Sequence, residues 1–386
     1  MRFSVFFPTL AVLSALGCVG SLEQIGGDAG GPILFLDGGA RPDAGALPDD
    51  GGASTEPDAT TTGVDAGPPA VDAGPSCPAG QTLCGAACVD TSSDATHCGR
   101  CGQPCAPGGS CVGGFCEGGV GCPPAPAGVD PEAAAALERT NEVRTAMGDP
   151  CMAMSVEINL AAERHCAYYV ANRGVSMCTA NAHGEVMGCD MFVAERFDGR
   201  MRAAGYSGVP VAENMHFIGN GASAVQGWID SVYHRNPVLR PWIGEMGYGR
   251  SGACDTSDYG GFSGADRNLV LTYPYPAQRD VPLSFDGRRE GPNPPAPTSG
   301  WPSGYPVTIF AQGDITTHRL TVDGSETDLP HVWLYPGHPD TYTLLRQEYV
   351  LYAEEPLTAG TTYRVRAEGT TPSREPFTVD FTFTTR

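Results

Sequence analysis

The residues with the clearest chemistry in this sequence are its fifteen cysteines. One, Cys18, stands alone near the N-terminus, eight lie between positions 77 and 116, and six lie between positions 122 and 254. Both larger groups are even, as two separately oxidised units require, and so many cysteines predict an oxidising compartment. Their pairing does not follow from the sequence. The predicted disulfide cysteines are Cys77, Cys84, Cys88, Cys98, Cys101, Cys105, Cys111, Cys116, Cys122, Cys151, Cys166, Cys178, Cys189 and Cys254.

Other chemistry is less clearly marked. The spacing Cys98-x-x-Cys101 could suggest zinc, but the close spacing of the eight cysteines in an exported chain favours disulfides. Asp255, Asp258 and Asp266 stand in a Gly-rich stretch predicted as a loop, where they could bind Ca²⁺ or simply be solvated. The chain has no HExxH, Gly-x-Ser-x-Gly or P-loop motif, which removes the commonest hydrolase and nucleotide signatures.

The N-terminus predicts export. Arg2 precedes a short apolar run, and Ala15-Leu16-Gly17 leads to Cys18, which resembles a bacterial lipobox with Ala15 where Leu is usual. We therefore predict residues 1–17 as a lipoprotein signal peptide, lipidation at Cys18, and a location at the outer membrane or cell surface. Ordinary signal-peptide cleavage, giving a secreted protein, is the alternative. No other stretch could span a bilayer, so the predicted membrane contact is through the N-terminal lipid only.

Charge and composition limit the partners and divide the chain. The formal net charge is −21, and all 23 basic residues are arginines, so nucleic acid and anionic lipid headgroups are disfavoured partners. Residues 18–76 repeat Asp-Ala-Gly four times and have few large apolar side chains, which predicts a disordered acidic Gly/Ala/Asp/Pro linker. Residues 77–122 are predicted as a small module stapled by disulfides, because so short a unit cannot build a sufficient core.

The main domain is predicted over residues 130–280. Helices are expected from Asp130-Pro131-Glu132 to about Met147 and over residues 156–173, 192–204 and 222–236, the last ended by Pro237. Strands are expected over 209–217 and 268–273, and the mixture predicts helices packed on a sheet. Residues 281–303 are predicted as a Pro-rich linker, and the period-two alternation in 304–386 predicts a β-sandwich.

Four stretches in the main domain resemble the CAP superfamily of cysteine-rich secretory proteins, antigen 5 and pathogenesis-related proteins, in particular its bacterial extracellular branch. The C-terminal stretch from Pro356 to Tyr363 is similar to a hairpin of bacterial Ig-like modules. The resemblance implies an α+β chain with a three-layer α/β/α CAP sandwich followed by an Ig-like β-sandwich. The four stretches are Asn141-Glu142-Val143-Arg144, Arg202-Ala203-Ala204-Gly205-Tyr206, Ala212-Glu213-Asn214, and the run from Trp228 to Asn236 with Leu239, Glu245, Gly247 and Gly249.

The resemblance also implies a cleft lined by two histidines and two glutamates. His183 and Glu213 correspond to the first of each, and His234 could replace the second histidine. Ser231 stands where the second glutamate is usual, so it is a further cleft candidate. His183, Glu213 and His234 could hold zinc or another divalent metal. The alternative is structural: the two rings bind backbone groups, Glu213 ties a loop together, and His234-Arg235 caps a helix C-terminus.

Three functions are compatible with these residues. The first is a surface-tethered, non-enzymatic binding module for a small apolar ligand, an envelope or lipid component, or a protein partner. The second is a metal-dependent hydrolase, such as a peptidase, with Glu213 as base and no catalytic residue assigned beyond the cleft candidates. The third is an adhesive or structural surface protein, in which the cleft has no chemical task.

Overall fold

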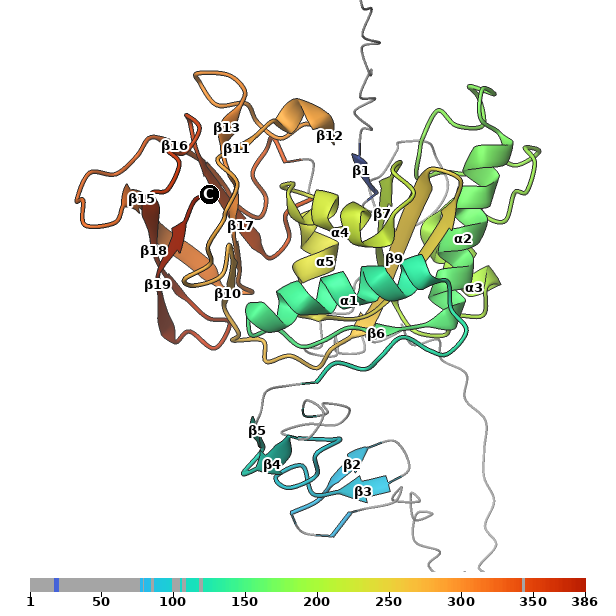
Figure 1. Cartoon of the computed structure of the whole chain (residues 1–386), viewed down its shortest axis with the longest axis horizontal. Helices are drawn as coiled ribbons and strands as arrows, with labels where there is room; N and C mark the ends of the chain where they lie inside the picture. The colour runs from blue at the N-terminus through green and yellow to red at the C-terminus, as the bar shows by residue number, and fades with distance from the viewer. Residues whose placement is uncertain are drawn as a thin grey trace, which may run out of the picture. The chain divides into compact units, whose positions relative to one another are not determined.

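The computed structural model describes residues 17–20, 77–78, 80–84, 87–98, 105, 109–117, 121–341 and 344–386 (Figure 1). The predicted signal peptide and acidic linker lie outside these residues, except for the short strand at 17–20. Among the described residues, none of the helices combines the length and apolar character that a membrane span needs.

The helices begin where capping residues are available. The Asp130 side chain accepts a hydrogen bond from the Glu132 N–H and caps α1, while Ser155 accepts one from the Ile158 N–H and caps α2. The bounds are α1 (Pro131–Ala146), α2 (Val156–Ala171), α3 (Phe197–Ala203), α4 (Gly221–Ile229) and α5 (Arg235–Leu239).

Two predicted helices differ from the structure. The helix expected over 192–204 begins at Phe197, because the preceding residues form a loop anchored on Glu185. The helix expected over 222–236 ends at Ile229, and Pro237 lies inside the separate helix α5 instead of ending the first. Proline is tolerated there because the first-turn N–H groups of a helix have no intrahelical acceptor.

A six-stranded sheet in the order β12-β1-β7-β9-β8-β6 organises the main domain. The strands β7, β9 and β8 pair antiparallel, whereas β1 with β12 and β6 with β8 are parallel. The strong pair β8–β9 was not predicted from the sequence, because glycines interrupt its alternation. The bounds are β1 (Gly17–Gly20), β6 (Ala153–Met154), β7 (Pro210–His216), β8 (Ile243–Ser251), β9 (Cys254–Phe262) and β12 (Glu290–Gly291).

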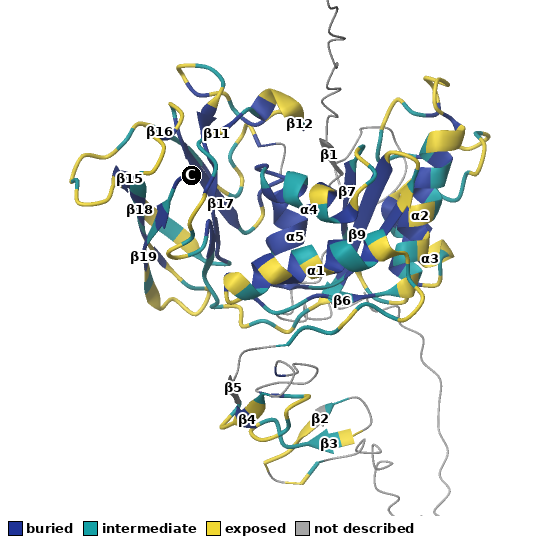
Figure 2. Ribbon diagram, in the orientation of Figure 1, coloured by how far each residue is buried: buried dark blue, intermediate teal, exposed yellow. Residues whose placement is uncertain are grey.

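Helices cover both faces of this sheet, and its strands are largely buried between them (Figures 1 and 2). On one face α2 packs against Gly247 and Gly249 of β8, where an added Cβ would come within 2.3 Å and 2.0 Å of α2 backbone nitrogens. These two glycines therefore allow the backbone of α2 to lie directly against β8. On the other face, Leu137 of α1 and Trp228 of α4 share a core with Met246 of β8.

The C-terminal part is built of antiparallel strands. One sheet has the order β10-β14-β17-β16, a second β15-β18-β19, and β11 pairs with β13. The bounds are β10 (Leu271–Tyr273), β11 (Ser284–Phe285), β13 (Ser303–Gly304), β14 (Val307–Phe310), β15 (Asp314–Val322), β16 (His331–Leu334), β17 (Glu348–Ala353), β18 (Thr362–Thr370) and β19 (Pro376–Thr384).

The boundary between the main domain and this part differs from the predicted one. The strand expected at 268–273 was assigned to the main domain, but β10 pairs with β14 of the C-terminal sheet. Residues 281–303, expected to be a linker, contain β11, β12, a 3₁₀ turn at Gly287–Arg289 and the start of β13. Arg235 of α5 donates to Pro306 O at 2.7 Å and lies over the ring of Tyr273, so the two parts share one core.

The cysteines form disulfides as predicted where the structure describes them. Twelve of them are disulfide-bonded, and the four pairs whose geometry is described are Cys98–Cys111, Cys122–Cys151, Cys166–Cys254 and Cys178–Cys189. The last three use all six cysteines of the second group, as the even count predicted. The described part of the cysteine-rich module contains two hairpins, β2 (Thr82–Cys84) with β3 (Ala87–Val89) and β4 (Ser110–Val112) with β5 (Phe115–Glu117).

Candidate functional site

The loop between α2 and α3 brings His183 onto the face of the sheet that α2 covers. The His183 Nδ1 atom lies 2.9 Å from Oε1 of Glu213 in β7. A carboxylate can only accept, so Nδ1 carries the hydrogen and donates it. Glu213 is fully buried, while 13% of the His183 side chain is exposed. Two of the residues placed in the cleft by resemblance are thus in direct contact.

Arg200 of α3 neutralises Glu213. Its Nη2 atom donates to Oε2 of Glu213 at 2.5 Å and to the His183 carbonyl at 3.2 Å. Burial by itself would raise the pKa of Glu213, but Arg200, with smaller contributions from His165 and His183, holds that pKa well below its usual value. Both carboxylate oxygens have a donor, so Glu213 stays ionised and is a weak base.

A second carboxylate–histidine pair anchors the same loop. The Glu185 Oε1 atom lies 3.0 Å from His165 Nδ1, and the other ring nitrogen of His165 lies 2.9 Å from Ala182 O. The Oε2 atom of Glu185 accepts the N–H groups of Val193 and Ala194. His165 and Glu185 are both buried, and together they fix the loop at its two ends.

Asp258 of β9 brings a third carboxyl group into this cluster. It is the register partner of Glu213, it is fully buried, and neither of its carboxyl oxygens has a hydrogen-bond donor among the described residues. Burial, then the nearby Glu213 carboxylate, raises the pKa of Asp258 well above its usual value, and Arg200 only partly opposes this. Asp258 therefore holds its proton while Glu213 remains charged.

We expect Asp258→Asn to flatten the pH dependence of stability. In the folded chain Asp258 keeps its proton to a higher pH than in the unfolded chain, where it is released near 3.8. The free energy of unfolding of the wild type therefore falls as the pH rises above about 4, by up to about 1.4 kcal/mol per pH unit. An asparagine cannot titrate, so the free energy of unfolding of the variant should not show this decrease.

Urea titrations of the full chain at several pH values between 4 and 8 measure this difference. The exposed residue Asp266 provides the control, because Asp266→Asn should leave the profile unchanged. An unaltered slope in Asp258→Asn would show that Asp258 is ionised in the folded chain.

His234 lies on the opposite side of the sheet from Glu213. Its Nδ1 atom lies 3.0 Å from Oε1 of Glu290, a residue of β12 in the segment predicted as linker. Glu290 also accepts the N–H groups of Val232, Tyr233 and His234, which places a carboxylate at the N-terminus of α5. The alternative of a charged His234 at a helix C-terminus is therefore wrong, since the residue precedes α5.

The reason for this separation is the alternation along β7. Glu213 points toward α2 and α3, and Asn214 points the other way, donating to the backbone oxygen of His234 at 2.8 Å. Ser231 is also on that side, where its hydroxyl donates to Trp228 O at 2.7 Å and is buried. His183 and Glu213 thus meet, whereas His234 and Ser231 have other partners.

The three-residue metal set is not assembled. Within the described residues no group of three His, Cys, Asp or Glu side chains is placed to hold a metal ion. Both oxygens of Glu213 are engaged by Arg200 and His183, so this carboxylate offers no free ligand position. Among the residues that the structure describes, His183 and His234 each have a buried Nε2 atom without a hydrogen-bond partner, so only two of the three predicted metal ligands keep a free atom. The residues therefore do not fit the predicted zinc site.

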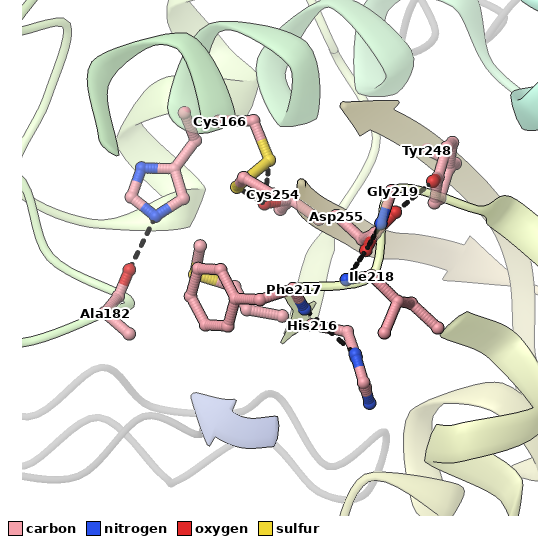
Figure 3. The surroundings of a disulfide bond; sticks show 12 residues. Cys166, Ala182, His216, Phe217, Ile218, Gly219, Tyr248, Cys254 and Asp255 are labelled. Atoms are coloured by element: carbon pink, nitrogen blue, oxygen red, sulfur yellow. Dashed lines mark hydrogen bonds between the residues drawn. A yellow bond between two sulfur atoms is a disulfide. The ribbon is translucent and has the colours of Figure 1, made fainter. Parts of the chain in front are cut away.

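Asp255 and Asp258 lie in β9, not in the loop predicted from the glycines. The Asp255 carboxylate accepts the N–H groups of Ile218 and Gly219 and the hydroxyl of Tyr248, beside the disulfide Cys166–Cys254 (Figure 3). With its oxygens engaged, Asp255 ties a loop to the sheet and is not free to bind Ca²⁺. Only Asp266 is in an exposed loop position.

Sequence reasoning missed most of the partners in this cluster. Arg200, Glu185, Glu290 and His165 were not candidates, and Asp258 was considered only as a possible Ca²⁺ ligand in a loop. Arg200 stands two residues before the Arg-x-Ala-Gly-Tyr stretch, and Glu185 two residues after His183. A buried arginine cannot be distinguished from an exposed one by such spacing, so no pattern marked them.

The motif residues quoted for the resemblance mostly hold the backbone. Asn141 exchanges two hydrogen bonds with the backbone of Met152, and the buried Arg144 donates to the carbonyls of Pro150, Val238, Arg240 and Ile243. The hydroxyl of Tyr206 donates to Glu245 at 2.5 Å. These contacts give the quoted residues structural roles in this chain.

Comparisons with known proteins match parts of the chain. Residues 70–118 match the model of the Stigma-specific STIG1-like protein family. A search of curated proteins found no match. An extracellular protein containing an SCP domain from Bacillus anthracis str. Ames aligns with 18% identity and a TM-score of 0.29, covering 33% of this chain and 40% of that one. The alignment thus spans less than half of that protein.

Two structures of PcoC, a methionine-rich copper resistance protein from Escherichia coli, also align. The native form has 16% identity and covers 30% of this chain and 93% of that one, and the selenomethionine form has 18% identity and covers 30% and 95%. The TM-score is 0.19 for both. What is established for this chain is a mixed α/β main domain, a sheet-rich C-terminal part, and disulfides that indicate a secreted or surface protein.

Proposed function

We propose that this chain is an exported lipoprotein, anchored at Cys18, that displays a CAP-type α/β/α domain as a non-enzymatic binding module. The C-terminal sheets are proposed to be an Ig-like spacer. In support, helices cover both faces of the main sheet, and all six cysteines from 122 to 254 are oxidised. The proposed ligand is a small apolar molecule, an envelope component or a protein segment that reaches His183.

One observation favours binding over catalysis: both carboxylate oxygens of Glu213 already accept hydrogen bonds. A general base works best when its pKa is near the working pH and one oxygen is free to take a proton. Glu213 has its pKa held low, Arg200 on one oxygen and His183 on the other. Such a carboxylate orients His183 and fixes the loop, and it removes a proton from water poorly.

The group left for a ligand is the second ring nitrogen of His183, Nε2. Its Nδ1 atom is engaged by Glu213, which leaves Nε2, and this buried atom has no partner among the described residues. A ligand hydroxyl or amide N–H could donate to it. Nε2 itself is buried although 13% of the side chain is exposed, so binding requires neighbouring groups to move aside.

The expected result is binding without turnover. The full-length protein purified from membranes should show no hydrolysis of a peptide library or of cell-wall fragments, with or without added zinc. Thermal shift with a panel of fatty acids, phospholipids and peptidoglycan fragments should reveal a stabilising probe, and His183→Ala should weaken its binding at least tenfold. His338→Ala, a histidine variant in the C-terminal part, is the matched control.

Cleavage of any of these substrates, abolished by Glu213→Gln, would contradict the proposal. Equal binding of every stabilising probe by the wild type and His183→Ala would also contradict it. A stability measurement on His183→Ala separates loss of the contact from loss of the fold.

A metal-dependent hydrolase is the second candidate, favoured by one observation. His183 and His234 each bear a carboxylate on Nδ1 and leave Nε2 open, which is how carboxylates orient metal-binding histidines. Metal analysis of purified protein distinguishes the two candidates. Because the two rings lie on opposite sides of the sheet, they could not share one ion, so zinc that is lost in His183→Ala or in His234→Ala, but not in both, would favour the hydrolase, and less than a tenth of an equivalent favours the binding module.

A further inference from the structure

The methionines of this chain fall into two sharply different groups. Six of the nine described by the structure are at most 9% exposed and belong to the cores. The remaining three are the exposed ones, at 68% for Met177, 74% for Met187 and 56% for Met191. All three lie within a span of fifteen residues in the loop between α2 and α3. Methionine is ordinarily a core residue, so this grouping calls for a reason at the surface.

The three methionines lie close in sequence to the two ends of one disulfide. The disulfide Cys178–Cys189 brings the two Cα atoms to 6.0 Å. Met177 directly precedes one cysteine, and Met187 and Met191 each stand two residues from the other. Since neighbouring Cα atoms are about 3.8 Å apart, the disulfide holds the backbone of all three methionines in one part of the loop, and a long unbranched side chain has several rotamers with which to approach an ion there.

Contacts with α2 fix both sides of this disulfide. The Tyr168 hydroxyl donates to Cys178 O at 2.8 Å and accepts the Val186 N–H at 2.9 Å. The Asn172 side chain donates to Asp190 O at 2.8 Å and accepts the Asp190 N–H at 3.1 Å. The backbone that carries the methionines is therefore rigid, although the side chains themselves are exposed.

The backbone at Met191 adds a second observation. Its φ is +58°, in the left-handed region that favours glycine or asparagine. Any core-filling role is excluded by its exposure, so the folded loop holds an unfavourable conformation that points this side chain to the surface. Such conformations persist where the surrounding structure fixes them, and they concentrate at ligand sites.

The possible metal donors of the loop differ between its inner and outer sides. Its histidine and buried glutamate, His183 and Glu185, face inward and are engaged by Glu213 and His165. The cysteines are oxidised and offer no thiolate. The outside of the loop carries the three thioethers together with the exposed carboxylates of Asp190 and Glu195, and of these donors thioether sulfur is the soft one, which favours Cu(I) over zinc, magnesium or calcium. We propose that Met177, Met187 and Met191 form a surface site for a soft monovalent metal ion, Cu(I).

This site is independent of the proposed cleft function, because His183 takes no part in it. Binding is measured by titrating the oxidised full-length protein with Ag(I), a soft monovalent probe that needs no reductant and so leaves the disulfide intact. The wild type should bind one Ag(I) per chain. The triple variant Met177→Leu, Met187→Leu, Met191→Leu should bind it at least tenfold more weakly.

Leucine keeps the volume and apolar character of each side chain, so this variant removes the sulfur atoms while retaining an apolar surface. Matched controls are His183→Ala, which should bind Ag(I) as the wild type does, and titration of the wild type with Zn(II), which should show no binding at this loop. Equal Ag(I) binding by the wild type and the triple variant would overturn the proposal. Loss of binding in His183→Ala would also overturn it, by assigning the ion to the histidine.

Discussion

The variant Arg200→Met should lower the free energy of unfolding by about 3–5 kcal/mol, the range found when one partner of a buried ion pair is removed. Arg200 is fully buried and is the main positive charge facing Glu213 and Asp258. Methionine fills a similar space without a charge. The loss is therefore expected from an uncompensated carboxylate, with little contribution from a cavity.

The pH dependence identifies the cause. Without Arg200, burial dominates and the pKa of Glu213 rises above its usual value of 4.5. The folded variant then binds a proton that the unfolded chain releases, so its stability recovers as the pH falls toward 4. Urea denaturation of wild type and variant at pH 7 and pH 4.5 should show a smaller difference at the lower pH.

Arg196→Met is the matched control. Arg196 is 45% exposed and pairs with Asp198 on the same helix end, and such surface pairs contribute about 0–1 kcal/mol. The double variant Arg200→Met, Glu213→Gln should regain part of the lost stability, because the unpaired charge is gone. A loss in Arg200→Met that is the same at both pH values would point to packing and contradict the electrostatic account.

The second large effect is expected from opening Cys166–Cys254. This disulfide joins α2 to the start of β9 across 88 residues, directly beside the Asp255 contacts (Figure 3). Closing a loop of this length restricts the unfolded chain, and its removal should cost about 4 kcal/mol. The double variant Cys166→Ala, Cys254→Ala, compared with the wild type by urea denaturation, measures this loss.

Cys178→Ala with Cys189→Ala provides the comparison. That disulfide closes only 11 residues, so the same reasoning gives a loss of about 3 kcal/mol or less. The shorter loop also lies at the surface, so its opening should raise hydrogen exchange mainly between residues 174 and 192. An unchanged unfolding midpoint in Cys166→Ala, Cys254→Ala would show that the packing of α2 on β9 holds without the bond.

Much of the architecture followed from local patterns. The cap at Asp130 is a short-range signal, and the first two helices and β7 lie close to where they were expected. The even cysteine counts predicted oxidation within the second group. The contact of His183 with Glu213 was expected only from resemblance, since 30 residues separate them.

The sequence by itself determined which side chains could ionise, pair or cap, because those properties belong to each residue and its near neighbours. Only the tertiary structure decided that Arg200 and Asp258 share the buried face with Glu213, that Glu290 of the expected linker binds His234, and that the three methionines near the disulfide Cys178–Cys189 are exposed. Strand register and the side of the sheet to which each side chain points determine which of these residues lie together. Both depend on contacts between residues that are distant in the chain.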